Sequence, residues 1–384
     1  MFMTTNNRAE AIVDLGAIKA NIKLLMKISG KPALAVVKAD AYGHGLVPVA
    51  KAAVEGGASW LGVALLEEAL TLRANDVRAP IIAWLTPITD DFVAAINNDI
   101  EIAIPSREHL QAVIAAAHEL KKVARIHLEM DTGMSRGGAL LDWDELLSDA
   151  VDAQSAGKVS IVGIWSHFAR ADEPGHQFNI QQRERFLNGV ATARDKGISP
   201  QIVHLSNSAA TINDPDSHFD LVRLGIAMYG LSPDVTTMGD SAKLSLKPAM
   251  TLRARIHLIK EVPAGSQVGY GGTAMTKSDT KLAVIAMGYA DGVPRNATSA
   301  TGVLIGNKMS PIIGRVSMDQ FVVDLGSDSQ ACVGDWAYLI GSEKVDSYTS
   351  DNCYTADSWA AACGTINYEI VTRIGPRVVR RYIG

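Results

Sequence analysis

A lysine that follows an apolar run near the start of the chain has the clearest chemical potential. Lys38 comes directly after Ala33–Val37, and burial beside such a run disfavours the charged ammonium and lowers the pKa of the amine. A neutral amine can attack a carbonyl and form a Schiff base. A lone lysine more often extends its charged end to water, so the neighbouring residues must decide between these interpretations.

Hydroxyl and backbone donors follow later apolar runs of the same kind. Ser208 and the turn at Gly225 and Ile226 follow two such runs, and Tyr42 lies four residues after Lys38. Donors of this type form phosphate sites after the seventh and eighth strands of parallel barrels. A reactive lysine together with a phosphate site indicates pyridoxal phosphate.

Two further polar residues are candidates for supporting this cofactor. Arg223 precedes the Gly225 turn, and a guanidinium, with a pKa above about 12, would leave a pyridine nitrogen that it faces unprotonated. The alternative for Arg223 is a strand arginine held by a salt bridge. His167 follows another apolar run, where we place it beside the ring in a supporting role. The alternative for His167 is a core histidine.

Short apolar runs alternate with segments of helical period between Pro32 and Gly225, and these elements must position the polar residues. Because parallel strands need crossover helices, eight such runs predict an eight-stranded α/β barrel. An open doubly wound sheet is the alternative, but no G-x-G-x-x-G turn follows the first run. The predicted strands are Ala33–Lys38, Trp60–Ala64, Ile81–Trp84, Ile100–Ile104, Ala124–Met130, Val159–Phe168, Gln201–Asn207 and Phe219–Leu224. The predicted helices are Val47–Glu55, Leu66–Arg73, Asp90–Asn97, Arg107–Leu120, Trp143–Ala156 and Ile180–Lys196.

The pattern changes after Gly239, where alternating runs separated by Gly, Pro, Asn and Asp predict a mainly β domain. We therefore expect a barrel over residues 11–238 and a β domain over residues 239–384, with residues 1–10 packing against the β domain. The segment Leu231–Ser245 is the expected linker. The predicted strands are Thr251–Val262, Lys281–Tyr289, Gly302–Asn307, Phe321–Leu325 and Trp336–Ile340.

Composition limits the possible partners of the chain. Its 384 residues are 47% hydrophobic and 20% charged, as is typical of a globular protein. The net charge of −5 and the absence of like-charge blocks give no indication of nucleic acid or an anionic membrane. The cysteines, Cys332, Cys353 and Cys363, lack metal-site spacing, so we expect reduced thiols and no metal. With no apolar leader or membrane span, a cytoplasmic protein is expected.

The segment Ala35–Gly45 closely resembles the cofactor-lysine signature of the alanine racemase family, which are fold-type III pyridoxal phosphate enzymes. Further blocks match this family in order across both predicted domains, so the resemblance covers essentially the whole chain. These blocks are Met130–Met134 with Arg136, Ser166–Phe168, Ser206–Ala209, Val222–Ile226 with Tyr229 and Gly230, Gly269–Gly271, Gly288–Gly292, Gly314–Gln320 and Gly364–Glu369.

The resemblance implies an eight-stranded barrel, a C-terminal β domain and a homodimer with shared active sites. The implied activity is interconversion of L-alanine and D-alanine, which supplies D-alanine for peptidoglycan. Lys38 looks like the cofactor lysine and the base on one face of the substrate. Tyr270 of the other subunit looks like the base on the opposite face. Such a pair satisfies racemisation, because a proton must leave one face and arrive on the other.

The resemblance also assigns supporting roles. Arg223 would contact the pyridine nitrogen, and His167 would link Arg223 to Tyr270. Arg136 and the backbone N–H of Met318 would lie near the substrate carboxylate, and Arg136 would also contact the phenolic oxygen of the cofactor. The implied phosphate contacts are Tyr42, Ser208, Gly225, Ile226 and Tyr368, and Asn207 is counted with the cofactor-binding residues. The residues implied along the substrate access route are Asp172, Tyr289, Arg295 and Arg315.

The chain departs from the family pattern at three positions. Many members carry a carbamylated lysine where this chain has Glu129, whose shorter side chain must reach Arg136 through a shifted backbone, through a water, or not at all. Ser135 replaces a usual glycine, and Ser317 replaces a frequent cysteine. Alanine is the favoured substrate because Tyr270, Tyr289 and Tyr368 would crowd the site.

Other interpretations of the same residues stay open. A serine or broad-specificity racemase is the alternative within the family. A non-enzymatic pyridoxal phosphate homeostasis protein would usually lack the second domain that carries Tyr270 and Met318. The blocks Gly288–Gly292 and Gly314–Gln320 argue against a fold-type III decarboxylase. A structural or interaction protein would not need polar residues at five strand ends.

Overall fold

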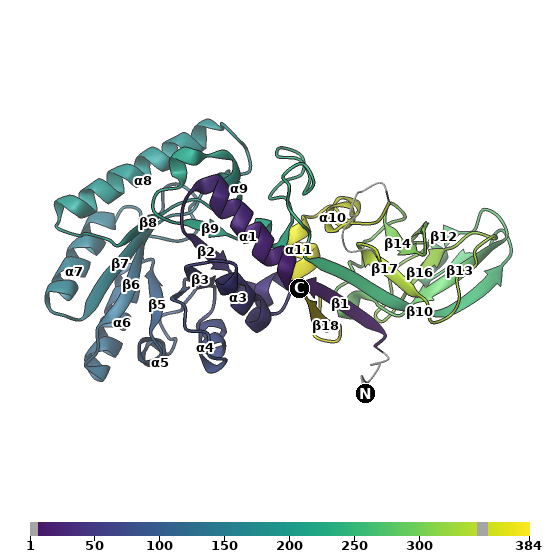
Figure 1. Cartoon of the computed structure of the whole chain (residues 1–384), viewed down its shortest axis with the longest axis horizontal. Coiled ribbons are helices and arrows are strands. Elements are labelled where there is room, and N and C mark those ends of the chain that lie inside the picture. Colours follow the sequence, from purple (N-terminus) through teal and green to yellow (C-terminus); the bar gives the residue numbers. More distant parts are fainter. Residues whose placement is uncertain (1–6, 344–351) are drawn as a thin grey trace. The chain divides into compact units, whose positions relative to one another are not determined.

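The structure is a computed structural model that describes residues 7–343 and 352–384, and these residues form two compact units (Figure 1). The barrel unit comprises Gly16–Ala41 and Leu46–Lys247. The β unit comprises the described residues up to Leu15, the short segment Tyr42–Gly45 and the described residues from Pro248 to Gly384. The chain therefore passes into the β unit for four residues directly after the turn that begins at Lys38.

The barrel unit contains eight parallel strands in the order β8-β7-β6-β5-β4-β3-β2-β9. Backbone hydrogen bonds from Asp220 N–H to Val203 O (3.1 Å) and from Arg223 N–H to Ser206 O (3.0 Å) join the segments around β8 and β9. The predicted barrel architecture is confirmed. The strands are β2 Ala33–Val36, β3 Trp60–Val63, β4 Ile81–Ala83, β5 Ile100–Ile104, β6 Ala124–Glu129, β7 Val159–Trp165, β8 Ile202–His204 and β9 Val222–Leu224.

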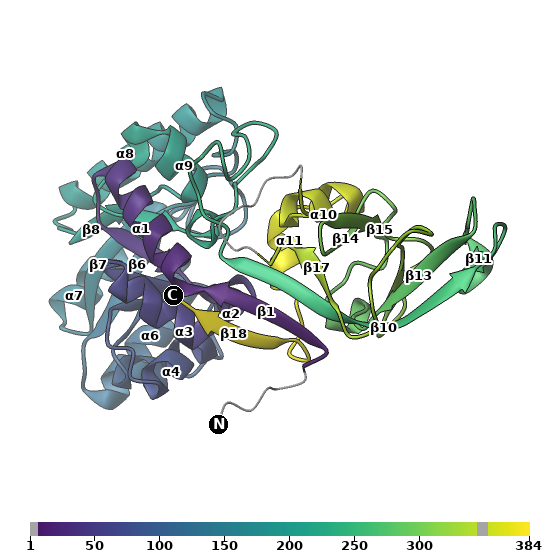
Figure 2. The ribbon, with the colours of Figure 1, turned by 45° about the vertical axis from the view of Figure 1, so that its right-hand side comes forward.

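Helices lie outside these strands, as Figures 1 and 2 show. Helix α6 is typical, because Leu110, Val113 and Ala117 recur at helical spacing and are buried. It ends at Lys121, which adopts a left-handed conformation with φ of 53°. The helices are α1 Leu15–Ser29, α2 Lys38–Tyr42, α3 Leu46–Glu55, α4 Leu66–Ala74, α5 Phe92–Asn97, α6 Arg107–Leu120, α7 Trp143–Ser155, α8 Gln177–Asp195 and α9 Ser208–Asn213, with short 3₁₀ helices η1 Pro215–Ser217 and η2 Ile226–Tyr229.

The long strand β10, Met250–Val262, organises the β unit. It pairs antiparallel with β1, β13 and β17, and β1 in turn pairs parallel with β18. The strands β1 Ala9–Asp14 and β18 Val379–Ile383 were not among the predicted strands, because neither shows a long alternating pattern. The remaining elements are β11 Gln267–Val268, β12 Ala274–Met275, β13 Thr280–Ile285, β14 Gly302–Ile305, β15 Lys308–Pro311, β16 Phe321–Asp324, β17 Trp336–Ile340, α10 Ala356–Cys363, α11 Asn367–Thr372, η3 Tyr270–Gly272 and η4 Tyr289–Asp291.

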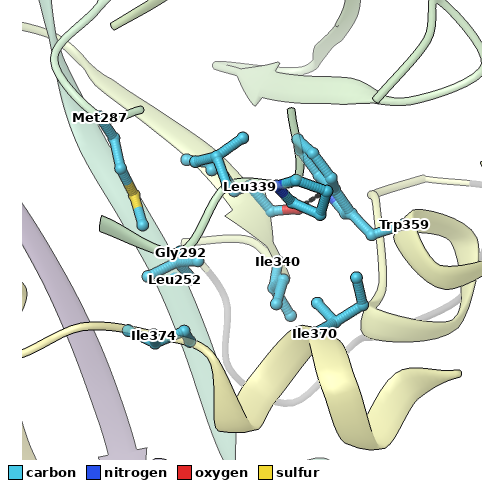
Figure 3. Close-up of a pocket in the computed structure, with 10 residues that line it drawn as sticks. Leu252, Met287, Gly292, Leu339, Ile340, Trp359, Ile370 and Ile374 are labelled. Atoms are coloured by element: carbon cyan, nitrogen blue, oxygen red, sulfur yellow. Dashed lines mark hydrogen bonds between the residues drawn. The ribbon is translucent and has the colours of Figure 1, made fainter. Parts of the chain in front are cut away.

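The two C-terminal helices of the β unit pack on its sheet through large apolar residues (Figure 3). Trp359 of α10 is fully buried, and its indole N–H donates to Leu339 O of β17 at 2.6 Å. Ile370 of α11 and Ile374 line the same small apolar pocket as Leu252 of β10. This packing places α11, which carries Tyr368, against the centre of the sheet.

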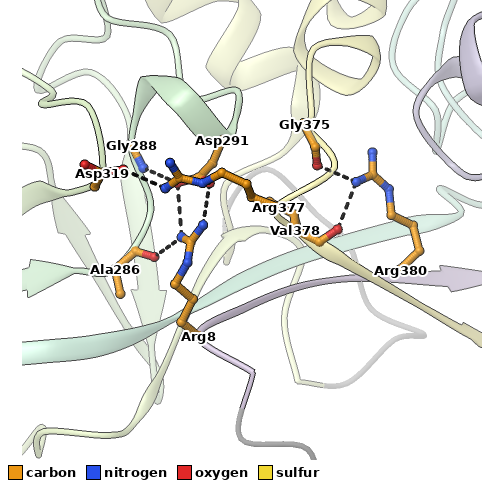
Figure 4. A network of polar contacts seen from close by, with 9 residues as sticks. All are labelled: Arg8, Ala286, Gly288, Asp291, Asp319, Gly375, Arg377, Val378 and Arg380. Carbon is orange, nitrogen blue, oxygen red and sulfur yellow. Dashed lines mark hydrogen bonds and ion pairs between the residues drawn. The ribbon is translucent and has the colours of Figure 1, made fainter.

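A buried carboxylate holds the loops of the β unit together (Figure 4). The side chain of Asp291 is fully buried and accepts hydrogen bonds from both Arg8 guanidinium nitrogens (2.5 and 3.1 Å) and from Gly288 N–H (3.0 Å). Arg377 contacts it at 2.9 Å and also pairs with Asp319 at 2.6 Å. A single carboxylate therefore joins the N-terminal strand, the loop at η4 and the loop that follows Met318.

These contacts make the stability of the β unit depend on pH. Burial alone raises the pKa of the Asp291 carboxyl, but hydrogen bonds from Arg8 and Gly288 and the charges of Arg8 and Arg377 outweigh it and lower the pKa below its usual range. A lowered folded-state pKa means that the stabilisation is present above the ordinary aspartate pKa of about 4 and is lost as the pH falls below it.

We expect Asp291→Asn to lower the free energy of unfolding by about 2 kcal/mol at pH 7, because charge-assisted hydrogen bonds are lost. The difference from wild type should shrink as the pH falls below about 4, where the wild-type carboxyl also becomes neutral. Thermal midpoints measured across this range test the expectation. The matched control is Asp319→Asn, which removes an exposed carboxylate that pairs with Arg377 and should cost under about 1 kcal/mol. Equal losses for the two variants would contradict the assignment.

Candidate active site

Lys38 begins a tight left-handed turn at the carboxyl end of β2. The four residues after it, Ala39–Tyr42, all have φ between 52° and 54°. Residues other than glycine pay about 1–2 kcal/mol each for this conformation, so surrounding contacts must maintain it. The Ala41 N–H donates to Val37 O at 2.9 Å, and Asp40 accepts from Leu46 N–H at 2.8 Å at the start of α3. The chain thus reverses within one turn after the lysine.

Glu68 of α4 fixes the backbone next to Lys38. Its carboxylate accepts hydrogen bonds from Ala39 N–H (2.6 Å) and from Ala64 and Leu65 N–H (3.0 and 3.1 Å). The Lys38 amine lies 5.9 Å from the centre of the Trp84 ring. Burial and the charge of Arg136 lower the pKa of Lys38, while Glu68 acts in the opposite direction. The predicted lowering of the amine pKa is therefore supported by the surroundings of this residue.

Arg223 lies inside the barrel with 4% of its surface exposed. Its two terminal nitrogens donate to the carbonyls of Ser166 (2.9 Å), Leu205 (3.0 Å) and His204 (3.1 Å) and to His167 Nδ1 (3.0 Å). Within the described residues Arg223 forms no ion pair with a carboxylate, so the salt-bridged alternative does not apply. Its Nε–H makes no hydrogen bond to these residues and can serve a ligand acceptor.

Burial lowers the pKa of Arg223 to about 9, although the charge of Glu129 raises it, and the guanidinium stays charged at neutral pH. Burial and the cations Arg223, Arg136 and Lys38 hold the pKa of His167 well below its usual range. His167 is thus neutral, its Nδ1 accepts from Arg223, and its proton is on Nε2. The structure thus brings Arg223 and His167 together through this hydrogen bond.

Glu129, the last residue of β6, lies beneath the loop that carries Arg136. A methyl group on Gly137 would lie 3.1 Å from Glu129 Oε1, and Asp131 accepts from Gly133 and Ser135 N–H to shape the same loop. Ser135 takes a left-handed φ of 58° there. In the described residues no hydrogen bond or ion pair joins Glu129 to Arg136, which is exposed. Burial raises the pKa of Glu129 to about 7, with Arg223 and Arg136 opposing the shift, so this carboxyl is harder to ionise than an ordinary glutamate.

The phosphate-type donors gather at the ends of β8 and β9. The Ser208 hydroxyl accepts from Gly225 N–H (2.8 Å) and Ala227 N–H (3.3 Å), which leaves its own O–H available as a donor. Ser208 and Ile226 are the first residues of α9 and η2, and the N–H groups there have no intrahelical acceptor. Asn207 instead caps α9, because its side chain accepts from Ala210 N–H at 3.1 Å.

The other two predicted phosphate contacts belong to the β unit. The rings of Tyr42 and Tyr368 have centroids 6.2 Å apart. Burial raises the pKa of the Tyr42 hydroxyl above its usual range, so this group stays a neutral donor. A Cβ on Gly43 would lie 2.2 Å from Val371 O, and φ there is 77°. Only glycine allows this close approach between the turn and α11.

The β unit presents the remaining predicted residues on neighbouring loops. Tyr270 is 69% exposed on η3, and a Cβ on the adjacent Gly271 would lie 3.6 Å from Arg315 Nη1. Met318 is 54% exposed, and its carbonyl accepts from Ala290 N–H (2.9 Å), beside the exposed Tyr289. Arg295 is also exposed in the β unit. Asp172 belongs to the barrel unit, where its carbonyl accepts from the Thr237 hydroxyl.

Sequence reasoning missed several residues that hold the site in place. Glu68 was not singled out, and neither were Glu101, His127 and His204, which are almost fully buried in barrel strands. The signal was available, because Glu101 and His127 interrupt the apolar strands Ile100–Ile104 and Ala124–Glu129. A charged or titratable residue inside such a run must find polar partners when it is buried.

Taken together, these features define a barrel protein with a desolvated lysine, a buried arginine and donors for a phosphate at the carboxyl ends of its strands. Family models agree with this class: residues 13–233 match "Alanine racemase, N-terminal domain" and residues 249–382 match "Alanine racemase, C-terminal domain". The chain belongs to the alanine racemase family.

Individual relatives match nearly the full length. The chain is similar to alanine racemases from Salinispora arenicola (49% identity, 98% of this chain and 99% of the relative) and Thermobifida fusca (45%, 98% and 98%). It is also similar to the crystal structure of alanine racemase from D-cycloserine-producing Streptomyces lavendulae (TM-score 0.94, 47% identity, 98% and 97% covered). The Bacillus anthracis structure with bound L-Ala-P matches at a TM-score of 0.87 and 35% identity, with 98% and 95% covered.

The position of Glu129 yields a prediction about stability. Because its folded-state pKa is raised, Glu129 favours the folded protein below the unfolded pKa near 4.5, and this contribution is lost as the pH rises through about 7. Glutamine cannot ionise. As the pH rises between these values, we expect the free energy of unfolding of Glu129→Gln to increase relative to that of wild type by up to about 3 kcal/mol. One pKa unit corresponds to about 1.4 kcal/mol.

Thermal midpoints of Glu129→Gln and wild type at about pH 4.5 and about pH 8 test this expectation. Glu119→Gln, at an exposed position of α6, is the matched control and should show no such trend. A difference between Glu129→Gln and wild type that does not change with pH would contradict the raised pKa.

Removal of dissolved bicarbonate should leave wild-type activity unchanged, because a glutamate carboxylate needs no carbon dioxide to form.

Proposed function

We propose that this chain is a pyridoxal phosphate-dependent alanine racemase that interconverts L-alanine and D-alanine. The observation that carries the proposal is the surroundings of Lys38, which is half-buried, lies within the electrostatic influence of Arg136 and begins a left-handed turn. These conditions raise the share of neutral, nucleophilic amine relative to a lysine in water. Membership of the alanine racemase family supports the substrate and the reaction.

The residues present fit the proposed cofactor. Ser208 retains a free O–H beside the N–H groups at the start of η2, as a phosphate requires. Arg223 keeps its Nε–H for the pyridine nitrogen and, as a cation at neutral pH, does not give that nitrogen its proton. Tyr42 is a neutral hydroxyl donor near Tyr368. The cofactor, when bound, supplies the electron-withdrawing ring that acidifies the Cα–H of the amino acid.

The chain's own residues then handle the protons. Lys38 accepts or returns the proton on one face of the substrate Cα, and the partner subunit's Tyr270 does the same on the other face. Arg136 and the Met318 N–H bind the substrate carboxylate, with Met318 again supplied across the dimer. Asp172, Tyr289, Arg295 and Arg315 line the access route. Exposure of Tyr270 and Met318 on the β unit supports a homodimer, because large exposed apolar groups commonly mark interfaces.

We place the enzyme in the cytoplasm, where D-alanine would be made for peptidoglycan. No disulfide joins Cys332, Cys353 or Cys363 within the described residues, which suits a reducing compartment. No helix in the described part of the chain is long and apolar enough to cross a bilayer. Among the same residues no cluster of three or more His, Cys, Asp or Glu side chains could hold a metal ion, and the proposed reaction needs none.

Lys38→Ala is expected to abolish racemisation, because both the cofactor-binding amine and one proton acceptor are lost. Borohydride should no longer fix cofactor to the chain, as measured by mass spectrometry. Lys51→Ala, which removes an exposed lysine from α3, is the matched control and should behave as wild type. Covalent cofactor on the Lys38→Ala protein would assign the cofactor to another lysine.

Mixing two inactive variants tests the shared active site. Lys38→Ala and Tyr270→Ala should each be nearly inactive, yet a heterodimer has one site with both residues intact. After random subunit exchange about half of the dimers are mixed and half of their sites are complete, so activity should return to about one quarter of wild type. Activity in the mixture, compared with each variant alone, is the measurement.

The control for the mixing experiment is the double variant Lys38→Ala/Tyr270→Ala. Mixed with Lys38→Ala, it forms no complete site and should give no recovery. If verified exchange between the two single variants also gives none, then Lys38 and Tyr270 act within one subunit or Tyr270 has no part in the reaction.

A further inference from the structure

A row of buried polar side chains crosses the barrel behind Arg223. Glu101 of β5, His127 of β6 and His204 of β8 are 1%, 0% and 1% exposed. The contacts are Glu101 Oε2 to His127 Nε2 at 2.8 Å, His127 Nδ1 to His204 Nε2 at 3.3 Å, and His204 Nδ1 to Arg223 Nη1 at 3.3 Å. Barrel interiors are normally filled by aliphatic side chains, so this row needs a reason.

The backbone is shaped to let the two histidines meet. Strand β7 lies between β6 and β8, and a register shift after Ile126 sets Gly163 of β7 opposite His127. A Cβ on Gly163 would lie 2.3 Å from His127 Nδ1. Any larger residue would therefore displace the His127 ring. The bulge and the glycine together open the path from β6 to β8.

The direction of every hydrogen bond in the row follows from its two ends. Arginine only donates, so His204 Nδ1 must carry a lone pair facing Arg223. The proton of neutral His204 is then on Nε2 and is donated to His127 Nδ1. His127 in turn carries its proton on Nε2 and donates it to the Glu101 carboxylate, which only accepts. Any other tautomer would set two donors or two acceptors against each other.

The charge states agree with this direction. Burial and the charge of Arg223 hold the pKa of His204 well below its usual range, so its ring is neutral. Burial alone would raise the pKa of Glu101, but hydrogen bonds from His127 and Arg125 and the charge of Arg125 outweigh it and lower the pKa. Arg125 donates twice to Glu101 (2.6 and 2.9 Å), and the Trp60 indole N–H donates at 3.1 Å. The carboxylate is thereby held as an anion.

The row connects Arg223 to the Glu101 carboxylate without direct contact between the two charged groups. Two neutral imidazoles aligned head to tail connect the Glu101 charge to the guanidinium, and such chains polarise in one direction. The same guanidinium also binds His167 Nδ1. Its orientation therefore determines both the donor left for the cofactor nitrogen and the position of His167.

We propose that Glu101 and His127 are positioning residues of the active site, which set the tautomer of His204 and through it the orientation of Arg223. The tautomers are a property of this chain alone, whereas the effect on catalysis rests on the racemase function proposed above. The test therefore measures the tautomers and the activity separately.

The first measurement is nuclear magnetic resonance of holoenzyme labelled with ¹⁵N-histidine, with signals assigned by single histidine substitutions. We expect His127 and His204 each to carry one proton, on Nε2. In Glu101→Gln the His127 signal should lose this single form, whereas Glu119→Gln should leave it unchanged. A wild-type His127 or His204 that is doubly protonated, or protonated on Nδ1, would overturn the proposal.

The second measurement compares two substitutions of His127. Glutamine can still accept from His204 and donate to Glu101, whereas leucine fills the space but does neither. Carboxylates that orient histidines in metal sites affect activity by about 10–100-fold, so we expect His127→Leu to lower kcat by about tenfold or more, with little change in KM because the row touches no substrate. His127→Gln should recover most of the loss.

These outcomes separate the possible explanations. Equal kcat for the leucine and glutamine variants would mean that His127 only fills space, which overturns the proposal. If His127→Leu does not fold, Glu101→Gln decides. Loss of the single His127 form in this variant, together with a fall in kcat, supports the proposal. An unchanged His127 spectrum with an unchanged kcat overturns the proposal. A wild type that does not racemise alanine would contradict the proposed function, while the tautomer measurement would still decide the arrangement of the row.

Discussion

Arg223 must remain charged inside a barrel, although only 4% of its surface is exposed to solvent. A buried cation is tolerated only when its donors are satisfied. Here Arg223 donates hydrogen bonds to the carbonyls of Ser166, Leu205 and His204, near the ends of β7 and β8. It also donates to the rings of His167 and His204. Strand ends supply such acceptors because the regular ladder of the sheet stops there. Much of the polar character of the barrel interior therefore follows from one guanidinium.

The second constraint is the left-handed turn after Lys38. Its residues adopt a left-handed conformation that is unfavourable for residues with a side chain. Hydrogen bonds from Ala39 N–H to Glu68 and from Leu46 N–H to Asp40 stabilise the turn. Gly43, which follows it, allows close packing against Val371. Strain of this kind often lies at functional sites, where surrounding contacts determine it. Lys38 and Tyr42 are the first and last residues of this turn.

The β unit faces a different constraint, because irregular loops outside its sheet must be held in place. Asp291 holds them by accepting from Arg8, Arg377 and the Gly288 backbone, and Gly288 itself leaves room for the carbonyls of Ser317 and Met318. These loops can then expose Tyr270, Tyr289 and Met318. The exposed apolar residues Tyr289 and Met318 thus lie on loops that the contacts of Asp291 and Gly288 hold in place.

The sequence by itself determined the barrel, because strand β5 and helix α6 fall at their predicted bounds and the hydrophobic periods of strand and helix differ. Strand β17 of the β unit also falls at its predicted bounds. The sequence also determined the polar strand ends, including Lys38, Ser208 and Arg223. Only the tertiary structure decided that β1 and β18 pair, that Glu129 makes no ion pair with Arg136 in the described residues, and that Glu101 is linked to Arg223 through two histidines. These depend on contacts between residues distant in sequence, and local patterns carry no record of which buried polar groups will meet.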